Sequence, residues 1–98
     1  MALNEKQKKH LRRLGHTLHP LVTVGQAGLT DAVVAELNRA LDDHELVKAR
    51  ARLPDREVRE ASFSALATRT ASTLVQRIGH VGLYFRPNPQ LSKIVMPD

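Results

Sequence analysis

The 98-residue chain contains no cysteine, which excludes disulfides, thiolate metal sites and cysteine nucleophiles. It also has no tryptophan, one tyrosine and two phenylalanines, so few rings are available to stack on nucleobases. No apolar run approaches the roughly 20 residues of a membrane-spanning helix. The N-terminal segment lacks the apolar region of a signal peptide. These absences predict a cytoplasmic protein without a membrane segment.

Basic side chains are in excess and unevenly spread. The chain has fifteen Lys and Arg and ten Asp and Glu, which gives a formal charge of +5. Residues 1–20 carry five basic and one acidic side chain, and residues 46–98 carry nine basic and four acidic ones. The segment between them, residues 21–45, carries one basic and five acidic side chains. Concentrated basic surface is typical of nucleic-acid-binding proteins, although it also serves solubility alone.

The length suits a single domain, and hydrophobic periodicity predicts seven elements. The expected helices are residues 5–14, 31–43 and 56–70, and the expected strands are residues 21–24, 46–52, 73–78 and 81–86. The order α-β-α-β-α-β-β predicts a two-layer α/β fold with a mixed four-stranded sheet. Strands joined through helices are expected to pair in parallel, and the final hairpin to add one antiparallel pair. Residues 1–87 form this domain, and residues 88–98 are a proline-containing tail, extended or loosely docked.

Alternation and capping signals predict which side chains face the core. Asn4 with Gln7, Thr30, and Pro54 with Asp55 mark the three helix starts. The third helix is expected to turn Val58, Ala61, Ala65 and Leu66 inward. Strand 46–52 places Val47, Ala49 and Ala51 on one face and Lys48, Arg50 and Arg52 on the other. In the last strand Val81, Leu83 and Phe85 point inward, which leaves Tyr84 and Arg86 on the outer face.

The segment from Val24 to Thr30 reads Val-Gly-Gln-Ala-Gly-Leu-Thr, a GxxG loop between a strand and a capped helix. Glycines let the backbone turn sharply and approach another chain closely. A helix N-terminus beside such a loop presents free amides to a phosphate backbone. Alone, the pattern is equally typical of a simple strand-to-helix connection. Asp31, at the helix start, would oppose an anion there.

Catalytic and metal-binding patterns are absent from the sequence. No nucleophile elbow, P-loop or dinucleotide fingerprint occurs. His16 and His19 are three residues apart, but the sequence offers no third ligand. We therefore expect a protein that is not an enzyme and has no cofactor or metal site.

Several short motifs, in order and at suitable spacing, resemble the CRM (chloroplast RNA splicing and ribosome maturation) family, in its bacterial stand-alone YhbY-type form. They are Lys9-His10-Leu11-Arg12-Arg13-Leu14-Gly15-His16, Pro20, Val24-Gly25-Gln26-Ala27-Gly28-Leu29-Thr30, His44-Glu45-Leu46-Val47-Lys48, Val75-Gln76-Arg77-Ile78-Gly79 and Tyr84-Phe85-Arg86-Pro87. The resemblance covers nearly the whole chain. The family often carries Lys or Arg where this chain has Gln26 and His80.

The resemblance implies a fold similar to the C-terminal domain of initiation factor three, and RNA binding through the GxxG loop and nearby basic surface. It further implies a ribosome assembly factor that contacts rRNA in precursors of the large ribosomal subunit. The candidate RNA-binding residues are Lys9, Arg12, Arg13, Gly25, Gln26, Ala27, Gly28, Lys48, Arg50, Arg52 and Arg86. With few aromatic side chains, recognition should depend on RNA shape and backbone rather than base stacking.

Two other interpretations remain open. The chain could be a protein-interaction module of the ribosome, in which the acidic segment 31–43 docks a basic ribosomal protein. It could also be a general small-RNA-binding protein or chaperone. In each case we expect a monomer.

Overall fold

The computed structural model describes residues 2–91 and 93–98 and contains the predicted element order. Its elements are α1 (Glu5–Gly15), β1 (Pro20–Val24), α2 (Asp31–His44), β2 (Leu46–Ala51), α3 (Arg56–Thr70), β3 (Thr73–Ile78) and β4 (Val81–Phe85). Each lies within a few residues of its expected range. No helix among the described residues is long and apolar enough to cross a membrane.

All three helices begin at the predicted caps. Asn4 Oδ1 accepts from Gln7 N at 2.8 Å, and the Gln7 side chain accepts from Asn4 N at 3.1 Å, which completes a capping box. Thr30 Oγ1 accepts from Val33 N at 3.2 Å at the start of α2. Asp55 accepts from two amides at the start of α3. These bonds satisfy amides that the helix itself leaves without a partner.

The four strands form one mixed sheet in the order β1-β2-β4-β3. β1 runs parallel to β2, as predicted. β4 lies between β2 and β3 and is antiparallel to both, so the sheet has two antiparallel pairs rather than the expected one. The second pair arises because β4, which follows the tight turn at Gly79 (φ +57°) and His80, lies beside β2 as well as β3. After this turn β4 folds back into the sheet beside β2, and β3 becomes an edge strand.

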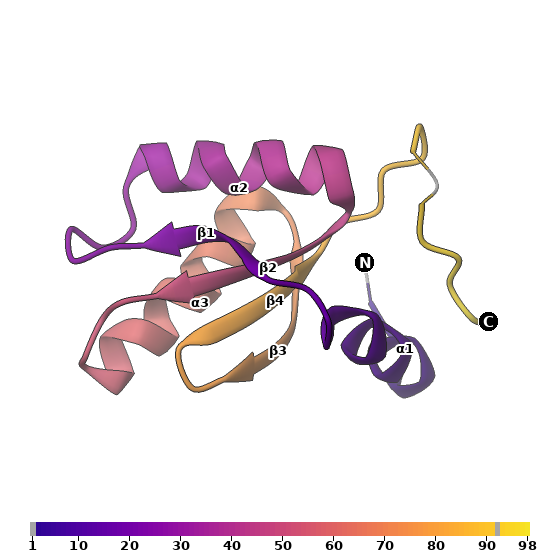
Figure 1. Cartoon of the computed structure of the whole chain (residues 1–98), viewed down its shortest axis with the longest axis horizontal. Helices are drawn as coiled ribbons and strands as arrows, with labels where there is room; N and C mark the ends of the chain where they lie inside the picture. The colour runs from indigo at the N-terminus through magenta and orange to yellow at the C-terminus, as the bar shows by residue number, and fades with distance from the viewer. Residues whose placement is uncertain (1, 92) are drawn as a thin grey trace.

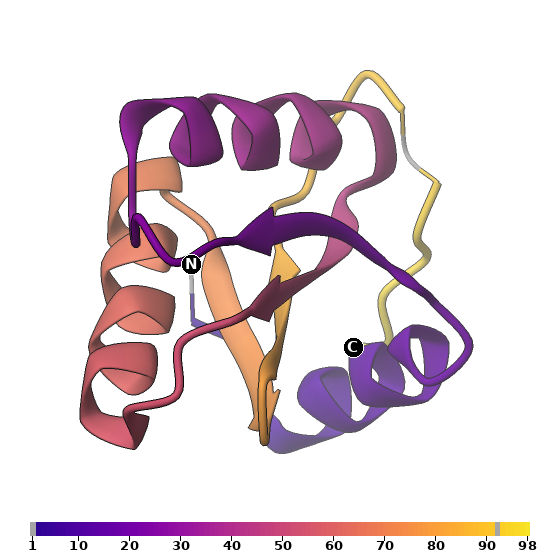
Figure 2. The same ribbon diagram turned by 60° about the vertical axis from the view of Figure 1, so that its left-hand side comes forward.

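Helices cover both faces of the sheet. α2 and α3 lie on one face, and α1 lies on the other (Figures 1 and 2). The α2/α3 side holds the larger core, which includes Val22, Leu37, Val47 and Phe63. A second cluster around Leu11, with Leu46, Val75, Leu83 and Phe85, fills the α1 side. The mixed four-stranded α/β fold is confirmed, with α1 as a third, partial layer beyond the two expected.

Because both faces are covered, β4 is buried on both sides. Leu83, Tyr84 and Phe85 are each at most 2% exposed. The prediction that Tyr84 lies on an outer face is therefore wrong. Alternation in sequence assigns residues to opposite faces, but it does not show whether the second face is covered.

The inward face of α3 also differs from the prediction. Phe63, Leu66 and Thr70 are its buried residues, whereas Val58 is 50% exposed and Ala61 is exposed. This helix is rich in small residues, so its apolar stripe is poorly defined in sequence. Burial of the large Phe63 ring against the sheet decides which side of α3 faces the core.

The tail after β4 is docked against the domain. Glu45 is 3% exposed, and its carboxylate accepts from the main-chain amides of Asn88 and Lys93, each at 2.8 Å. Ile94 and Met96 pack against the cluster around Leu11. The tail thus follows the start of β2 and the α1 side of the sheet.

Candidate nucleic-acid interface

The segment Gly25–Gly28, here called the glycine turn, projects beyond the end of β1 (Figure 1). Gly28 N donates to Gly25 O at 2.9 Å, and Gly28 has a φ of +80° that favours glycine. Gly25 has no positive φ, and a Cβ placed on it would meet no atom within 4 Å. Gln26 and Ala27 are exposed between them. Gly28 is therefore needed for the turn itself, whereas Gly25 leaves open space for an approaching chain.

Two further segments lie beside the turn at the same end of the sheet. Arg52 N donates to Val24 O at 2.8 Å, which ties the end of β2 to the end of β1. Ala51 N donates to His80 O at 2.8 Å, which ties it to the β3–β4 turn. Arg59 supports this end from α3, since its guanidinium donates to Leu53 O at 2.9 Å and to Gly79 O at 3.1 Å. The glycine turn is thus attached to a braced sheet end.

Asp31 follows the turn at the start of α2. Its Oδ1 lies 2.7 Å from Nη2 of Arg69 in α3. Both groups are well exposed, so this ion pair adds little stability. It does place a cation beside the one carboxylate that the sequence analysis identified as opposing an anion at this site.

Six of the predicted cations lie on α1 or in and directly after β2. Leu46, Lys48 and Arg50 alternate with core residues along β2, so they project toward the face that α1 covers. Lys48 is half-buried and Arg50 and Arg52 are exposed. On α1, Lys9 and Arg13 are exposed and Arg12 is half-buried. We call this set the basic face; its members are Lys9, Arg12, Arg13, Lys48, Arg50 and Arg52.

The basic face extends from α1 to the glycine turn, which lie at opposite ends of the long axis (Figure 1). Lys48 and Arg50 lie between these two ends, on β2. No member of the basic face forms an ion pair within the described ranges 2–91 and 93–98. Other arginines do, for example Arg77, which lies 3.2 Å from Glu60. The charges of the basic face are therefore available to an anionic ligand.

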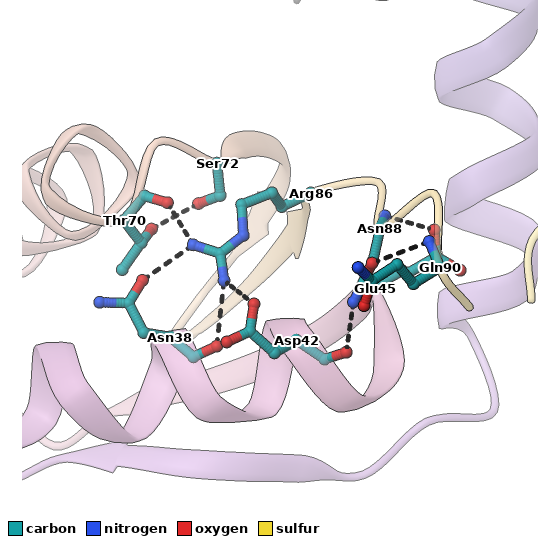
Figure 3. Close-up of polar contacts among 8 residues, drawn as sticks. All are labelled: Asn38, Asp42, Glu45, Thr70, Ser72, Arg86, Asn88 and Gln90. Carbon is teal, nitrogen blue, oxygen red and sulfur yellow. Dashed lines mark hydrogen bonds and ion pairs between the residues drawn. The ribbon is translucent and has the colours of Figure 1, made fainter. Parts of the chain in front are cut away.

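Arg86 is the exception among the predicted residues, because it lies between α2 and α3 (Figure 3). Its Nη1 donates to Asn38 Oδ1 at 2.8 Å and to Thr70 O at 2.6 Å. Its Nη2 donates to Asn38 O at 3.0 Å and to Asp42 Oδ1 at 2.8 Å. The side chain is 23% exposed. The expected outer-face position is wrong: the guanidinium joins two helices on the side away from the basic face.

A shallow hollow on the basic face was not foreseen. Its volume is about 220 Å³, and it lies over β4 between Lys48 and Gln76. Ile78, Val81 and Leu83 complete its lining. No sequence motif indicates it, because it depends on β4 lying between β2 and β3.

The histidines do not converge on a metal site. His16 and His19 are exposed in the segment between α1 and β1. Among the residues that the structure describes, no three His, Asp or Glu side chains form a group that could hold a metal ion. The observed site is thus a surface of cations and backbone amides.

Fold and site together define a small α/β domain with a basic face and an exposed glycine turn at one sheet end. The CRS1 / YhbY (CRM) domain family model matches residues 3–86. The chain belongs to this family.

Relatives align along nearly the whole chain. A Pseudomonas aeruginosa protein named as a probable RNA-binding protein is 45% identical over 93 residues, which are 95% of this chain and 89% of that protein. A Haemophilus influenzae protein named as an RNA-binding protein is 40% identical and covers 98% of this chain and 96% of its own length. The solution structure of a hypothetical Staphylococcus aureus protein, titled as a candidate RNA-binding protein, superposes with a TM-score of 0.84 at 27% identity. That match covers 98% of this chain and all of the other.

Proposed function

We propose that this protein binds structured RNA through the glycine turn and the basic face, as a binding protein without catalytic activity. The observation that carries the proposal is the open glycine turn beside Arg50 and Arg52, two exposed arginines without an ion pair among the described residues. Arginine suits phosphate because its guanidinium offers paired donors. The names of the two relatives and the family membership agree with this ligand.

The mode of binding follows from the side chains available. Gly25 lets a sugar–phosphate chain approach the backbone, and Gln26 offers an amide to a phosphate or a base edge. The cations on α1 contact phosphates farther along the same RNA. Because the chain has few aromatic residues, shape and backbone carry most of the affinity, and sequence readout is small.

Binding to a structured RNA, measured by fluorescence anisotropy, tests the role of the turn. Gly25→Glu introduces a carboxylate where the fold has open space, so we expect binding to weaken about tenfold or more. Ala61→Glu is the matched control, since Ala61 is exposed on α3, which covers the sheet face opposite the basic face. Equal affinities for the two variants would refute the role of the glycine turn.

We further propose that the RNA is ribosomal RNA in precursors of the large subunit, which the protein binds as a cytoplasmic monomer. Ribosomal proteins are further candidate partners in the same particles. Sedimentation of tagged protein from growing cells through sucrose gradients tests this. We expect migration with large-subunit precursors at low salt and loss of that migration at moderate salt, because phosphate contacts release counterions. Protein confined to the top of the gradient at both salt concentrations would instead favour a small-RNA-binding protein.

A further inference from the structure

An apolar groove of about 510 Å³ lies on the α1 side of the sheet, at the end away from the glycine turn. Its volume falls within the range typical of ligand sites. The end of α1, the segment leading to β1, the start of β2 and the docked tail surround it. Its apolar lining includes Leu14, Leu18, Leu21, Leu46, Val47 and Ile94.

Exposed leucines gather in this groove. Leu14, Leu18 and Leu21 are 39%, 37% and 53% exposed, respectively. They come from three consecutive segments: α1, the connection after it, and β1. Single exposed leucines are common, but an apolar patch of several marks a contact surface. The patch lies beside the RNA-binding surface proposed above and shares only Lys48 with it.

The groove also contains an unpaired stretch of strand. β1 begins opposite Lys48, since its first pairing is Pro20 with Lys48. Leu46 and Val47 pair with Phe85 and Tyr84 of β4 on their other side. Among the described strands, none pairs with these two residues on the side of β1. Both residues are nevertheless buried, at 5% and 1% exposure, so they form the base of the groove and not an open strand edge.

Two lysines, Lys48 and Lys93, line the groove, and none of the described residues that line it is acidic. Lys93 Nζ donates to the main-chain oxygen of Asp43 at 3.1 Å, so this contact leaves its charge without a carboxylate partner. Glu45 directly precedes Leu46 in sequence, and its buried carboxylate accepts from the amides of Asn88 and Lys93. Charge complementarity therefore selects an anionic occupant, and the leucines require that occupant to be apolar as well.

We propose that this groove binds a peptide segment of a protein partner that carries both acidic and apolar side chains. The segment lies beside Leu46 and Val47, places apolar side chains on the leucines, and directs carboxylates toward Lys48 and Lys93. RNA fits less well, because the exposed leucines Leu14, Leu18 and Leu21 match apolar side chains rather than a sugar–phosphate chain. The inference adds a second ligand to the proposed RNA-binding protein.

Selection of displayed random heptapeptides on the intact protein tests the proposal. We expect enriched sequences to combine apolar and acidic residues. The double variant L18S/L21T, which removes apolar side chains from the groove but adds no charge, should bind an enriched peptide at least tenfold more weakly. Val58→Thr is the matched control, because Val58 is 50% exposed on α3, outside the groove. This variant should bind the peptide normally.

Two further measurements separate the groove from the RNA site. In amide NMR spectra, an enriched peptide should shift the signals of Leu21, Leu46 and Val47 and leave those of Gln26 and Ala27 unchanged. L18S/L21T should retain RNA affinity within twofold. The proposal is overturned if no enriched peptide depends on the leucines, if enriched peptides are basic, or if RNA alone shifts the signals of Leu18 and Leu21.

Discussion

The hydroxyl of Tyr84 in β4 donates a hydrogen bond to the main-chain oxygen of Phe63 in α3, 2.9 Å away. Both side chains are fully buried. The bond satisfies a polar group that would otherwise be costly in the core, and it fixes α3 against the central strand. Gly82, two residues earlier, allows this packing: a Cβ there would come within 3.1 Å of both aromatic rings.

Removal of this hydrogen bond should lower stability without loss of the fold. Tyr84→Phe keeps the ring but removes the donor, so we expect the free energy of unfolding to fall by about 1–2 kcal/mol. Urea denaturation monitored by circular dichroism measures this. An unchanged midpoint would mean that the hydroxyl contributes nothing in the core.

Alkaline pH should destabilise the protein through the same residue. Burial raises the pKa of Tyr84 above its ordinary value of 10.0, against a smaller opposing effect of Arg77. In the unfolded chain the phenol ionises near pH 10, whereas in the folded protein it stays neutral. Its contribution to stability is therefore complete below about pH 10 and is lost as pH rises through the folded pKa. Since Tyr84 is the single tyrosine, phenolate absorbance should appear only with unfolding, and Tyr84→Phe should flatten the alkaline loss.

Arg86 and Arg52 should separate stability from RNA binding. Arg86→Lys loses the forked contacts to Asn38, Thr70 and Asp42, so we expect a loss of about 2–3 kcal/mol in unfolding free energy. Arg52→Gln should leave stability within about 0.5 kcal/mol, because its side chain is exposed. It should instead reduce the slope of log affinity against log salt by roughly 0.7–0.9. If Arg86→Lys instead weakened RNA binding and left stability unchanged, Arg86 would belong to the RNA-binding surface.

The two glycines of the turn should respond differently to alanine. Gly28→Ala forces a side chain into a positive φ, and we expect a cost of about 1–2 kcal/mol. Gly25→Ala meets open space at an ordinary φ and should cost less than about 0.5 kcal/mol. Thermal unfolding of both variants gives the comparison. Equal losses would show that Gly25 also serves the fold.

Gln26 provides a gain-of-affinity test. It is exposed at the centre of the glycine turn. Gln26→Lys should strengthen RNA binding and steepen the salt slope by roughly 0.7–0.9 if the turn contacts phosphate. Glu36→Gln on α2 changes the net charge equally and is the control, because Glu36 is exposed outside the glycine turn and the basic face. A similar gain in both variants would indicate a general charge effect.

Local signals in the sequence were sufficient for the elements and for part of the site. Asn4, Thr30 and Asp55 begin the helices because capping depends on neighbouring backbone groups. The alternation of Lys48 and Arg50 with Val47 and Ala49 predicted their common face, since side chains in a strand point to opposite sides in turn. The glycine turn could be predicted for the same reason, because the positive φ of Gly28 is a local property of the backbone.

Contacts between distant segments decided the rest. The place of β4 between β2 and β3 depends on how the final hairpin folds onto the sheet, and it buries Tyr84 on a face that alternation alone left open. The role of Arg86 depends on Asn38 and Asp42, which are more than 40 residues away in sequence. The apolar groove exists for two reasons. The first residue of β1, Pro20, pairs with Lys48, so that no part of β1 lies beside Leu46 and Val47, and the tail docks next to this gap. Sequence patterns report what each residue does to its neighbours along the chain, whereas burial and pairing across the sheet arise only when the elements pack together.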